Sequence, residues 1–343
     1  MSDTSAPKPR LHPGFLWGGL IIGLSAILIG LLSLFILPSL HSGARDVALG
    51  IVAEQQTTDT IEQTLTAEAP DAFDLASYGS ADDLARAIEE REVSGGFVID
   101  ASGMQVLTAS AGSTAVSATI SATGTAIAAN LGVEAQVTDV VPLPDADPSG
   151  VGIGGLAFPL VFGGIVPAVA FRSLLPGRRA WILSGLLGFS AVGGLIVAGV
   201  LAFIFGSIAT SAIVPVAGGV ALGIAALALP LAGLFECFGG KGFTIAAMLM
   251  MFVGNPFAGI STGAQWLPAG VGLIGQLLPP GAAGTLVRSL AYFGGAGGGA
   301  AALTLSIWVI AGLALWFAGP AIRRAKATAA VIEADAAEPV AAA

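Results

Sequence analysis

Side chains that usually perform catalysis or hold metals are scarce in this chain. It has one cysteine, Cys237, and two histidines, His12 and His41, which flank the first apolar stretch. A single cysteine excludes an internal disulfide and a cysteine-based metal cluster, and two histidines at a helix end do not form a metal site by themselves. No nucleophile lies beside a base, and no G-x-x-x-x-G-K-[ST] phosphate loop occurs. We therefore expect no catalytic, cofactor-binding or metal site, and we do not expect an enzyme.

Carboxylates are concentrated in one segment. Of the 22 acidic residues, 17 lie between residues 40 and 150. The cluster that comes nearest to a calcium loop is Asp145, Asp147 and Ser149, but it lacks the regular ligand spacing around a glycine, and its prolines favour a linker. The acidic residues are expected to form a solvated surface. The net charge of −9 argues against nucleic-acid binding, because no basic face is available to neutralise phosphates.

Most of the chain is expected to form apolar helices. The chain is 55% hydrophobic and only 10% charged, where an ordinary soluble domain is about 25% charged. A helical membrane span needs about 20 mostly apolar residues. Six stretches fit, and the first is read as an uncleaved anchor because it exceeds the length of a signal-peptide core. The six predicted spans cover residues 15–37, 151–171, 181–205, 212–235, 243–260 and 300–318.

The distribution of Lys and Arg predicts the orientation. Six spans would place nine of the 13 basic residues on one side, and basic residues accumulate in the short loops on the cytoplasmic side. The nine are Lys8, Arg10, Arg172, Arg178, Arg179, Lys241, Arg323, Arg324 and Lys326; the other four are Arg45, Arg86, Arg91 and Arg288. We predict a multi-pass protein of the plasma membrane with both termini in the cytoplasm. Glu236 and Lys241 at the cytoplasmic edge are expected to pair with each other or to snorkel.

The polar segment between the first two spans predicts an α/β domain outside the cytoplasm. Short apolar runs indicate strands, and Ser80 opens a stretch with helical spacing. The expected strands are 47–53, 73–78, 96–99, 105–107 and 137–143, and the expected helices are 80–92 and 114–131. The predicted organisation is a cytoplasmic tail (1–14), transmembrane helix 1 (15–39), the extracytoplasmic α/β domain (40–150), a membrane domain with transmembrane helices 2–6 (151–320) and a disordered cytoplasmic tail (321–343).

A helix break and a possible binding surface are predicted late in the chain. Gly254, Asn255 and Pro256 interrupt the fifth span, because proline cannot supply the helical N–H and disfavours a helical residue before it. The apolar run 271–278 is too short to span and predicts a re-entrant segment on the outer face, between helices 5 and 6. Arg288 is either a snorkelling anchor or a contact for an anionic lipid or substrate. Trp266 and Tyr292 are the other candidate contacts. Ionisable residues are nearly absent from the spans, which argues against a proton pump.

Taken together, these features resemble the type-2 ABC exporter (ABC-2 type) permeases, and among them the YhgE/Pip-like bacterial membrane proteins. The resemblance covers residues 15–320. It depends most on Gly254-Asn255-Pro256-Phe257-Ala258-Gly259, Trp266-Leu267-Pro268, Leu278-Pro279-Pro280-Gly281, Arg288-Ser289 and Tyr292-Phe293, and also on Gly95 to Ile99, Asp139-Val140-Val141-Pro142-Leu143-Pro144 and Asp147-Pro148-Ser149-Gly150.

The resemblance implies a permease subunit that exports a lipid-like or amphipathic compound. It further implies membrane lipids, a separate ATPase subunit and a second copy of the chain as partners. One feature departs from the pattern. Such permeases contact their ATPase through a cytoplasmic helix between the second and third spans, whereas only Arg172 to Ala180 lies there, interrupted by Pro176-Gly177. The alternative function is therefore a non-transporting membrane scaffold or envelope-interaction protein that uses its acidic extracytoplasmic domain.

Overall fold

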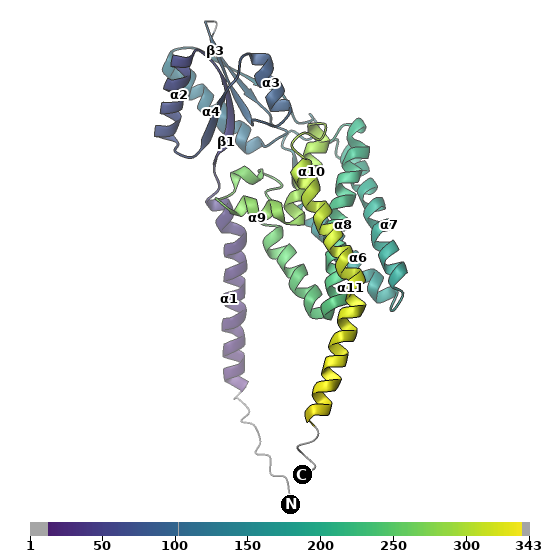
Figure 1. Ribbon diagram of the computed structural model, residues 1–343. Coiled ribbons are helices and arrows are strands. Elements are labelled where there is room, and N and C mark those ends of the chain that lie inside the picture. Colours follow the sequence, from purple (N-terminus) through teal and green to yellow (C-terminus); the bar gives the residue numbers. More distant parts are fainter. Residues whose placement is uncertain (1–12, 102, 338–343) are drawn as a thin grey trace, which may run out of the picture.

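The protein consists of an α/β domain standing on a group of long helices (Figure 1). This computed structural model describes residues 13–101 and 103–337, so most of the predicted tail 1–14 lies outside the described residues. Within these residues, five helical stretches are long and apolar enough to cross a membrane. The structure thus agrees with the predicted helical membrane protein that carries an α/β domain. The five stretches are Trp17–Pro38, Val151–Leu174, Arg179–Ile204, Thr210–Gly254 and Gly299–Ala330.

The first helix stands apart from the others. Helix α1 (Pro13–Leu40) is exposed along most of its apolar stretch, with Pro38 buried at its upper end, and Figure 1 shows it separated from the remaining helices along most of its length. At its upper end, Leu37 and Pro38 face Phe257 and Pro268 across an apolar groove of about 470 Å³. The apolar surface of α1 is the kind that lipid or another protein normally covers.

The α/β domain is built on a five-stranded mixed sheet. Its order is β2-β1-β3-β4-β5, and all neighbouring pairs are parallel except the β3–β4 hairpin. The strands are β1 (Val47–Val52), β2 (Phe73–Ser77), β3 (Gly95–Asp100), β4 (Gly103–Thr108) and β5 (Ala135–Asp139), and the helices are α2 (Gln55–Glu68), α3 (Ala81–Glu89) and α4 (Thr114–Leu131).

The two faces of the sheet have separate cores. Because successive strand residues point to opposite faces, Phe97 packs with the side chains of α2 and α4, whereas its neighbour Val98 packs with α3. Helix α3 begins at Ser80, whose side chain accepts a hydrogen bond from the Asp83 backbone N–H, as the sequence predicts. Helix α2 was not predicted; only Ile61 and Leu65 of its apolar side chains are buried, which is a weak signal.

Below the sheet, the chain forms α5 (Val151–Gly154), α6 (Ala157–Leu174), α7 (Arg179–Gly199) and the π-helix η1 (Val200–Ile204). A 3-10 turn, η2 (Thr210–Ala212), leads into the long α8 (Ile213–Leu249). Within α8, Gly239 has φ 68° and ψ −157°, which is not helical, so two helical segments meet there. Figure 1 shows the ribbon reversing at the lower end of α8. The fourth predicted span (212–235) and most of the fifth (243–260) fall within Thr210–Gly254, so the count of six spans stays a prediction.

After this hairpin the chain forms short elements beneath the α/β domain. They are the π-helix η3 (Met250–Gly254), the 3-10 turn η4 (Ala264–Trp266), α9 (Val271–Leu277) and α10 (Pro279–Tyr292). Their backbones lie very close together: a side chain at Gly275 would collide with the Phe257 carbonyl, and one at Gly281 with the Gly275 carbonyl. Glycine is therefore required at both positions.

The last helix is longer than a bilayer requires. Helix α11 (Gly299–Ala337) has 39 residues, which corresponds to about 58 Å, against about 30 Å of hydrocarbon in a membrane. The sequence predicts a disordered tail from residue 321, but the helix continues to Ala337. Residues 338–343 of that tail lie outside the described residues. Alanine-rich sequence with few helix breakers favours this continuation.

Candidate functional site

Arg288, the first of the three candidate contact residues, lies on α10 where the α/β domain meets the helices. Its side chain is buried, with 8% of the residue exposed, so it does not snorkel to the surface as one interpretation of the sequence expected. The guanidinium donates hydrogen bonds to the carbonyls of Gly112, in the α/β domain, and Ile260. Burial, followed by the charge of nearby Arg91, lowers its pKa to about 10. Arg288 therefore connects the two parts of the protein.

Tyr292 and Trp266 lie in the same junction. The Tyr292 hydroxyl donates to the Ser207 carbonyl at 2.9 Å, and burial, followed by the charge of Asp147, raises its pKa to about 12. Trp266 packs against the core beneath the sheet, and its carbonyl accepts from the Gly43 N–H at 3.0 Å. Contact of Arg288, Tyr292 or Trp266 with substrate or lipid stays a prediction.

The predicted helix break lies beside α10. The π-helix η3 ends at Gly254, and turns follow at Asn255 and Pro256. A side chain added at Gly254 would contact the Pro280 ring, so glycine allows the broken helix to approach α10 closely. Asn255 is buried, and its Oδ1 has no hydrogen-bond partner among the described residues. A buried, unsatisfied amide oxygen destabilises the fold unless water or a ligand reaches it.

A large apolar groove lies between α5 with the start of α6 on one side and the end of α7 with η1 on the other, and we call it the groove between α6 and α7. Its volume is about 660 Å³, within the range of roughly 300–1,000 Å³ that is usual for small-molecule sites. Valine, leucine and isoleucine side chains form most of its wall, including Ile196, Val200 and Ile204. Its upper end is polar. There, Asp147 accepts from the N–H groups of α5, and the Ser207 hydroxyl is buried without a hydrogen-bond partner among the described residues.

A buried ion cluster at the opposite end of the helices was not predicted. Glu236 of α8 is 1% exposed and pairs with three arginines from three other segments. Arg172 and Arg323 reach its two carboxylate oxygens at 2.6 Å, and Arg179 lies 3.2 Å from Oε2. The expectation that Glu236 pairs with Lys241 is therefore wrong. The lone carboxylate in an apolar span, with arginines at the ends of neighbouring spans, was the available signal.

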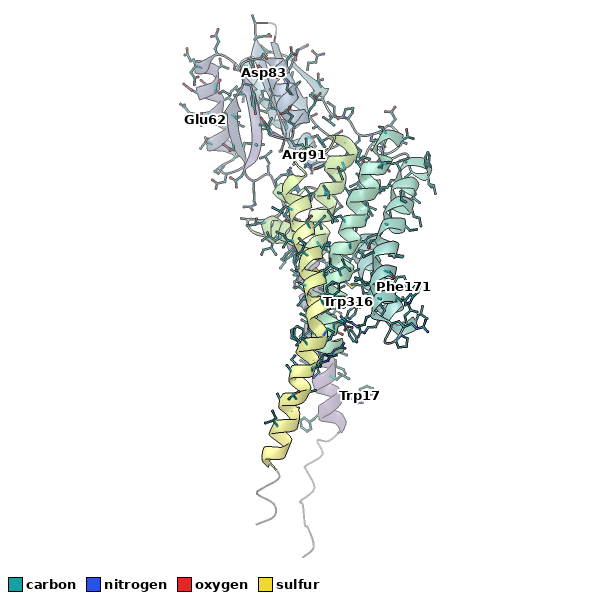
Figure 2. The ribbon with its side chains drawn as sticks, turned by 45° about the vertical axis from the view of Figure 1, so that its right-hand side comes forward. Trp17, Glu62, Asp83, Arg91, Phe171 and Trp316 are labelled. Carbon is teal, nitrogen blue, oxygen red and sulfur yellow. The ribbon has the colours of Figure 1, made fainter. Side chains whose placement is uncertain are left out.

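Aromatic rings complete this cluster. The guanidinium of Arg172 lies over the ring of Phe235 at 3.5 Å, and that of Arg179 lies over the ring of Trp316 at 4.9 Å. Trp316 is buried, and Figure 2 shows it with Phe171 near the lower end of the helices, on the side away from the sheet. Three cations against one anion leave this end of the protein positively charged. The cluster joins α6, α7, α8 and α11.

Within the described residues, no group of three or more His, Cys, Asp or Glu side chains is arranged to hold a metal ion. The fold and these sites together define a class: a helical membrane protein with an α/β domain attached through a buried arginine and an apolar groove between its helices. Comparison of the chain with protein-family models, curated proteins and solved structures found no match.

Proposed function

We propose that this chain is the permease subunit of an ABC-2-like exporter that moves a lipid-like or amphipathic compound across the plasma membrane. In this proposal the chain has six spans, with both termini in the cytoplasm and the α/β domain outside. The permease works with a separate ATPase subunit and a second copy of itself.

The groove between α6 and α7 is the observation that carries this proposal. An amphiphile has an apolar tail and a polar head, and the groove has an apolar wall with polar Asp147 and Ser207 at its upper end. Its wall includes exposed side chains such as Ile196 and Ile204, so a lipid-like molecule can enter sideways from the bilayer. The broken helix at Asn255 is compatible with the same function, since non-helical backbone at membrane depth occurs where it is buried in protein or lines a water-filled cavity.

A groove-filling variant tests this function. In Val200→Trp the indole would occupy the groove, whereas Val192→Trp places the same side chain on an exposed part of α7 outside the groove. Both proteins would be placed in nanodiscs with a phospholipid that carries a photoreactive acyl chain. We expect the wild type and Val192→Trp to cross-link at groove residues and Val200→Trp to lose this labelling. Equal labelling in all three would overturn the amphiphile site.

The alternative function is a non-transporting scaffold or envelope-interaction protein. It is favoured by the connection between α6 and α7, which comprises only residues 175–178 and has no room for an ATPase-binding helix. Affinity purification from native membranes separates the two functions. A stoichiometric ATPase in the purified complex supports the permease. Repeated recovery with envelope proteins and without an ATPase supports the scaffold.

A further inference from the structure

A second pocket lies in the junction between the α/β domain and the helices, and polar and charged side chains form part of its lining. Its volume is about 240 Å³. The side chains relevant to binding come from the start of β1, from the turn after α3, from the start of α4 and from η4. They are Asp46, Arg91, Glu92, Ser94, Ser113 and Gln265. We call this cavity the junction pocket.

Arg91 provides a half-buried positive charge at this pocket. Figure 2 shows it between the sheet domain and the upper ends of the helices. It donates a 2.6 Å hydrogen bond to the Ser289 hydroxyl and lies 5.0 Å from the centre of the Phe293 ring. Both partners are neutral, and no carboxylate forms an ion pair with Arg91 among the described residues. Burial lowers its pKa.

A second guanidinium increases the positive potential. Arg288 donates to the carbonyl of Gly112, a residue that also lines the junction pocket, and it too has no carboxylate partner among the described residues. A half-buried and a buried cation near each other, Arg91 and Arg288, are costly without a counterion. An oxyanion in the pocket would reduce this cost at Arg91 directly and at Arg288 through space.

Two carboxylates complete the lining. Asp46 and Glu92 are exposed, so they lie where the pocket meets solvent. Neither forms an ion pair with a basic residue in the described part of the chain, although Glu92 directly follows Arg91. The pocket therefore presents unpaired charges of both signs, with the positive charge inside and the negative charges at the mouth.

The backbone is strained at two of the three charged residues that line the pocket, Asp46, Arg91 and Glu92. Asp46 and Arg91 have φ values of 46° and 61°, in the left-handed region that side chains other than glycine seldom adopt. Asp71, which lies outside the pocket, is the third non-glycine residue of this kind in the described chain. Strained residues of this type often occur at binding sites, where their conformation directs a side chain to a ligand.

We propose that the junction pocket binds a small zwitterion, with its oxyanion against Arg91 and its ammonium group toward Asp46 and Glu92. Ser94, Ser113 and Gln265 supply neutral polar groups beside the oxyanion. This site is separate from the groove between α6 and α7, and the inference holds whether or not the chain is a permease.

The test is calorimetric titration of the full-length protein in micelles of an uncharged maltoside detergent, whose head groups carry neither a phosphate nor an ammonium group. The probe is O-phosphoethanolamine, which carries both charges; inorganic phosphate and ethanolamine carry one sign each. We expect O-phosphoethanolamine to bind about tenfold more tightly than either single-charge probe, because hydrogen bonds to charged groups are the stronger ones. No binding of O-phosphoethanolamine, or equal binding of phosphate alone, would overturn the proposal.

Variants at the mouth test the role of the carboxylates without disturbing a buried contact. In the double variant Asp46→Asn, Glu92→Gln, the affinity for O-phosphoethanolamine should fall to that for phosphate; asparagine tolerates the left-handed backbone at residue 46. Asp71→Asn is the matched control, since Asp71 is also exposed and left-handed, and it should bind like the wild type. An unchanged affinity in the double variant would contradict the proposal.

Arg91→Gln tests the oxyanion side. It should abolish binding of both O-phosphoethanolamine and phosphate, provided that circular dichroism shows the wild-type fold. Nanodiscs that contain phosphatidylethanolamine distinguish the source of the zwitterion. If phosphatidylethanolamine in the nanodisc weakens the binding of O-phosphoethanolamine, the natural ligand is a lipid headgroup. If it does not, the natural ligand is a soluble zwitterion, and either result is consistent with the pocket.

Discussion

Arg172 donates a 2.6 Å hydrogen bond to the buried carboxylate of Glu236 while its guanidinium covers the ring of Phe235. Residues from α6 and α8 are thereby joined at the end of the helices opposite the sheet. Glu236 also accepts from Arg323 of α11. One carboxylate therefore balances charges from several helices.

Replacing Glu236 by glutamine should destabilise the protein strongly. The variant keeps the shape of the side chain but leaves Arg172, Arg179 and Arg323 without their anion. Loss of one partner from a buried ion pair costs roughly 3–5 kcal/mol, and the partial exposure of these arginines favours the lower end of that range. Thermal unfolding in detergent measures the effect. Arg323→Gln should cost about 1 kcal/mol or less, because that side chain is 46% exposed; equal losses in the two variants would contradict this account.

The contact between α8 and α11 depends on glycine. A side chain at Gly312 of α11 would lie 2.4 Å from the Pro230 nitrogen and close to the Leu229 backbone. We expect Gly312→Ala to force the helices apart and to lower stability by about 1–3 kcal/mol. Gly218→Ala on α8 is the control, since nothing lies within 4 Å of its added Cβ. A thermal midpoint for Gly312→Ala as high as that of the control would show that the helices do not pack this closely.

Much of the α/β domain could be predicted from sequence, because local patterns encode it. A short apolar run identifies β3, and Ser80 identifies the start of α3. Helix α2 was missed because only Ile61 and Leu65 face the core among polar neighbours. Local sequence patterns predict the ends of α11 and of the fourth predicted span less well. There, a run of alanine continued one helix, and a single glycine, Gly239, separates two helical segments.

The candidate sites were harder to predict, because they join residues far apart in the chain. The sequence placed Arg172, Glu236 and Arg323 on one side of the membrane, but no spacing rule pairs residues that are 64 or 87 positions apart. The residues of the junction pocket are likewise far apart in the chain. Asp46 and Arg91 belong to different loops, and only the parallel arrangement of β1 and β3 brings them to one cavity.

The six-span arrangement predicts where an impermeant thiol reagent will react. Cys237 is buried, and in a Cys237→Ala background single cysteines can replace the exposed residues Asp59, Lys241 and Thr328. Asp59→Cys, in the α/β domain, should be labelled in intact cells. Lys241→Cys and Thr328→Cys should be labelled only after the membrane is permeabilised. Labelling of Lys241→Cys from outside would mean that the hairpin at Gly239 does not face the cytoplasm.

Tyr292 and Arg288 predict a pH dependence with opposite signs. The folded pKa of Arg288, about 10, lies below its ordinary value, so the unfolded chain binds more protons above that pH and stability rises with pH. The folded pKa of Tyr292, about 12, lies above its ordinary value, so the folded protein binds more protons there and stability falls. The two contributions oppose each other above about pH 10.

Tyr292→Phe removes one of these contributions and the hydrogen bond to the Ser207 carbonyl. At about pH 9 the variant should be less stable than the wild type by about 1 kcal/mol, the usual contribution of one hydrogen bond. As the pH rises to about 11, the wild type loses the contribution of Tyr292 and the variant does not. The difference between their thermal midpoints should therefore shrink over this range. A difference that stays constant would show that the Tyr292 hydroxyl titrates with the same pKa in the folded and unfolded chains.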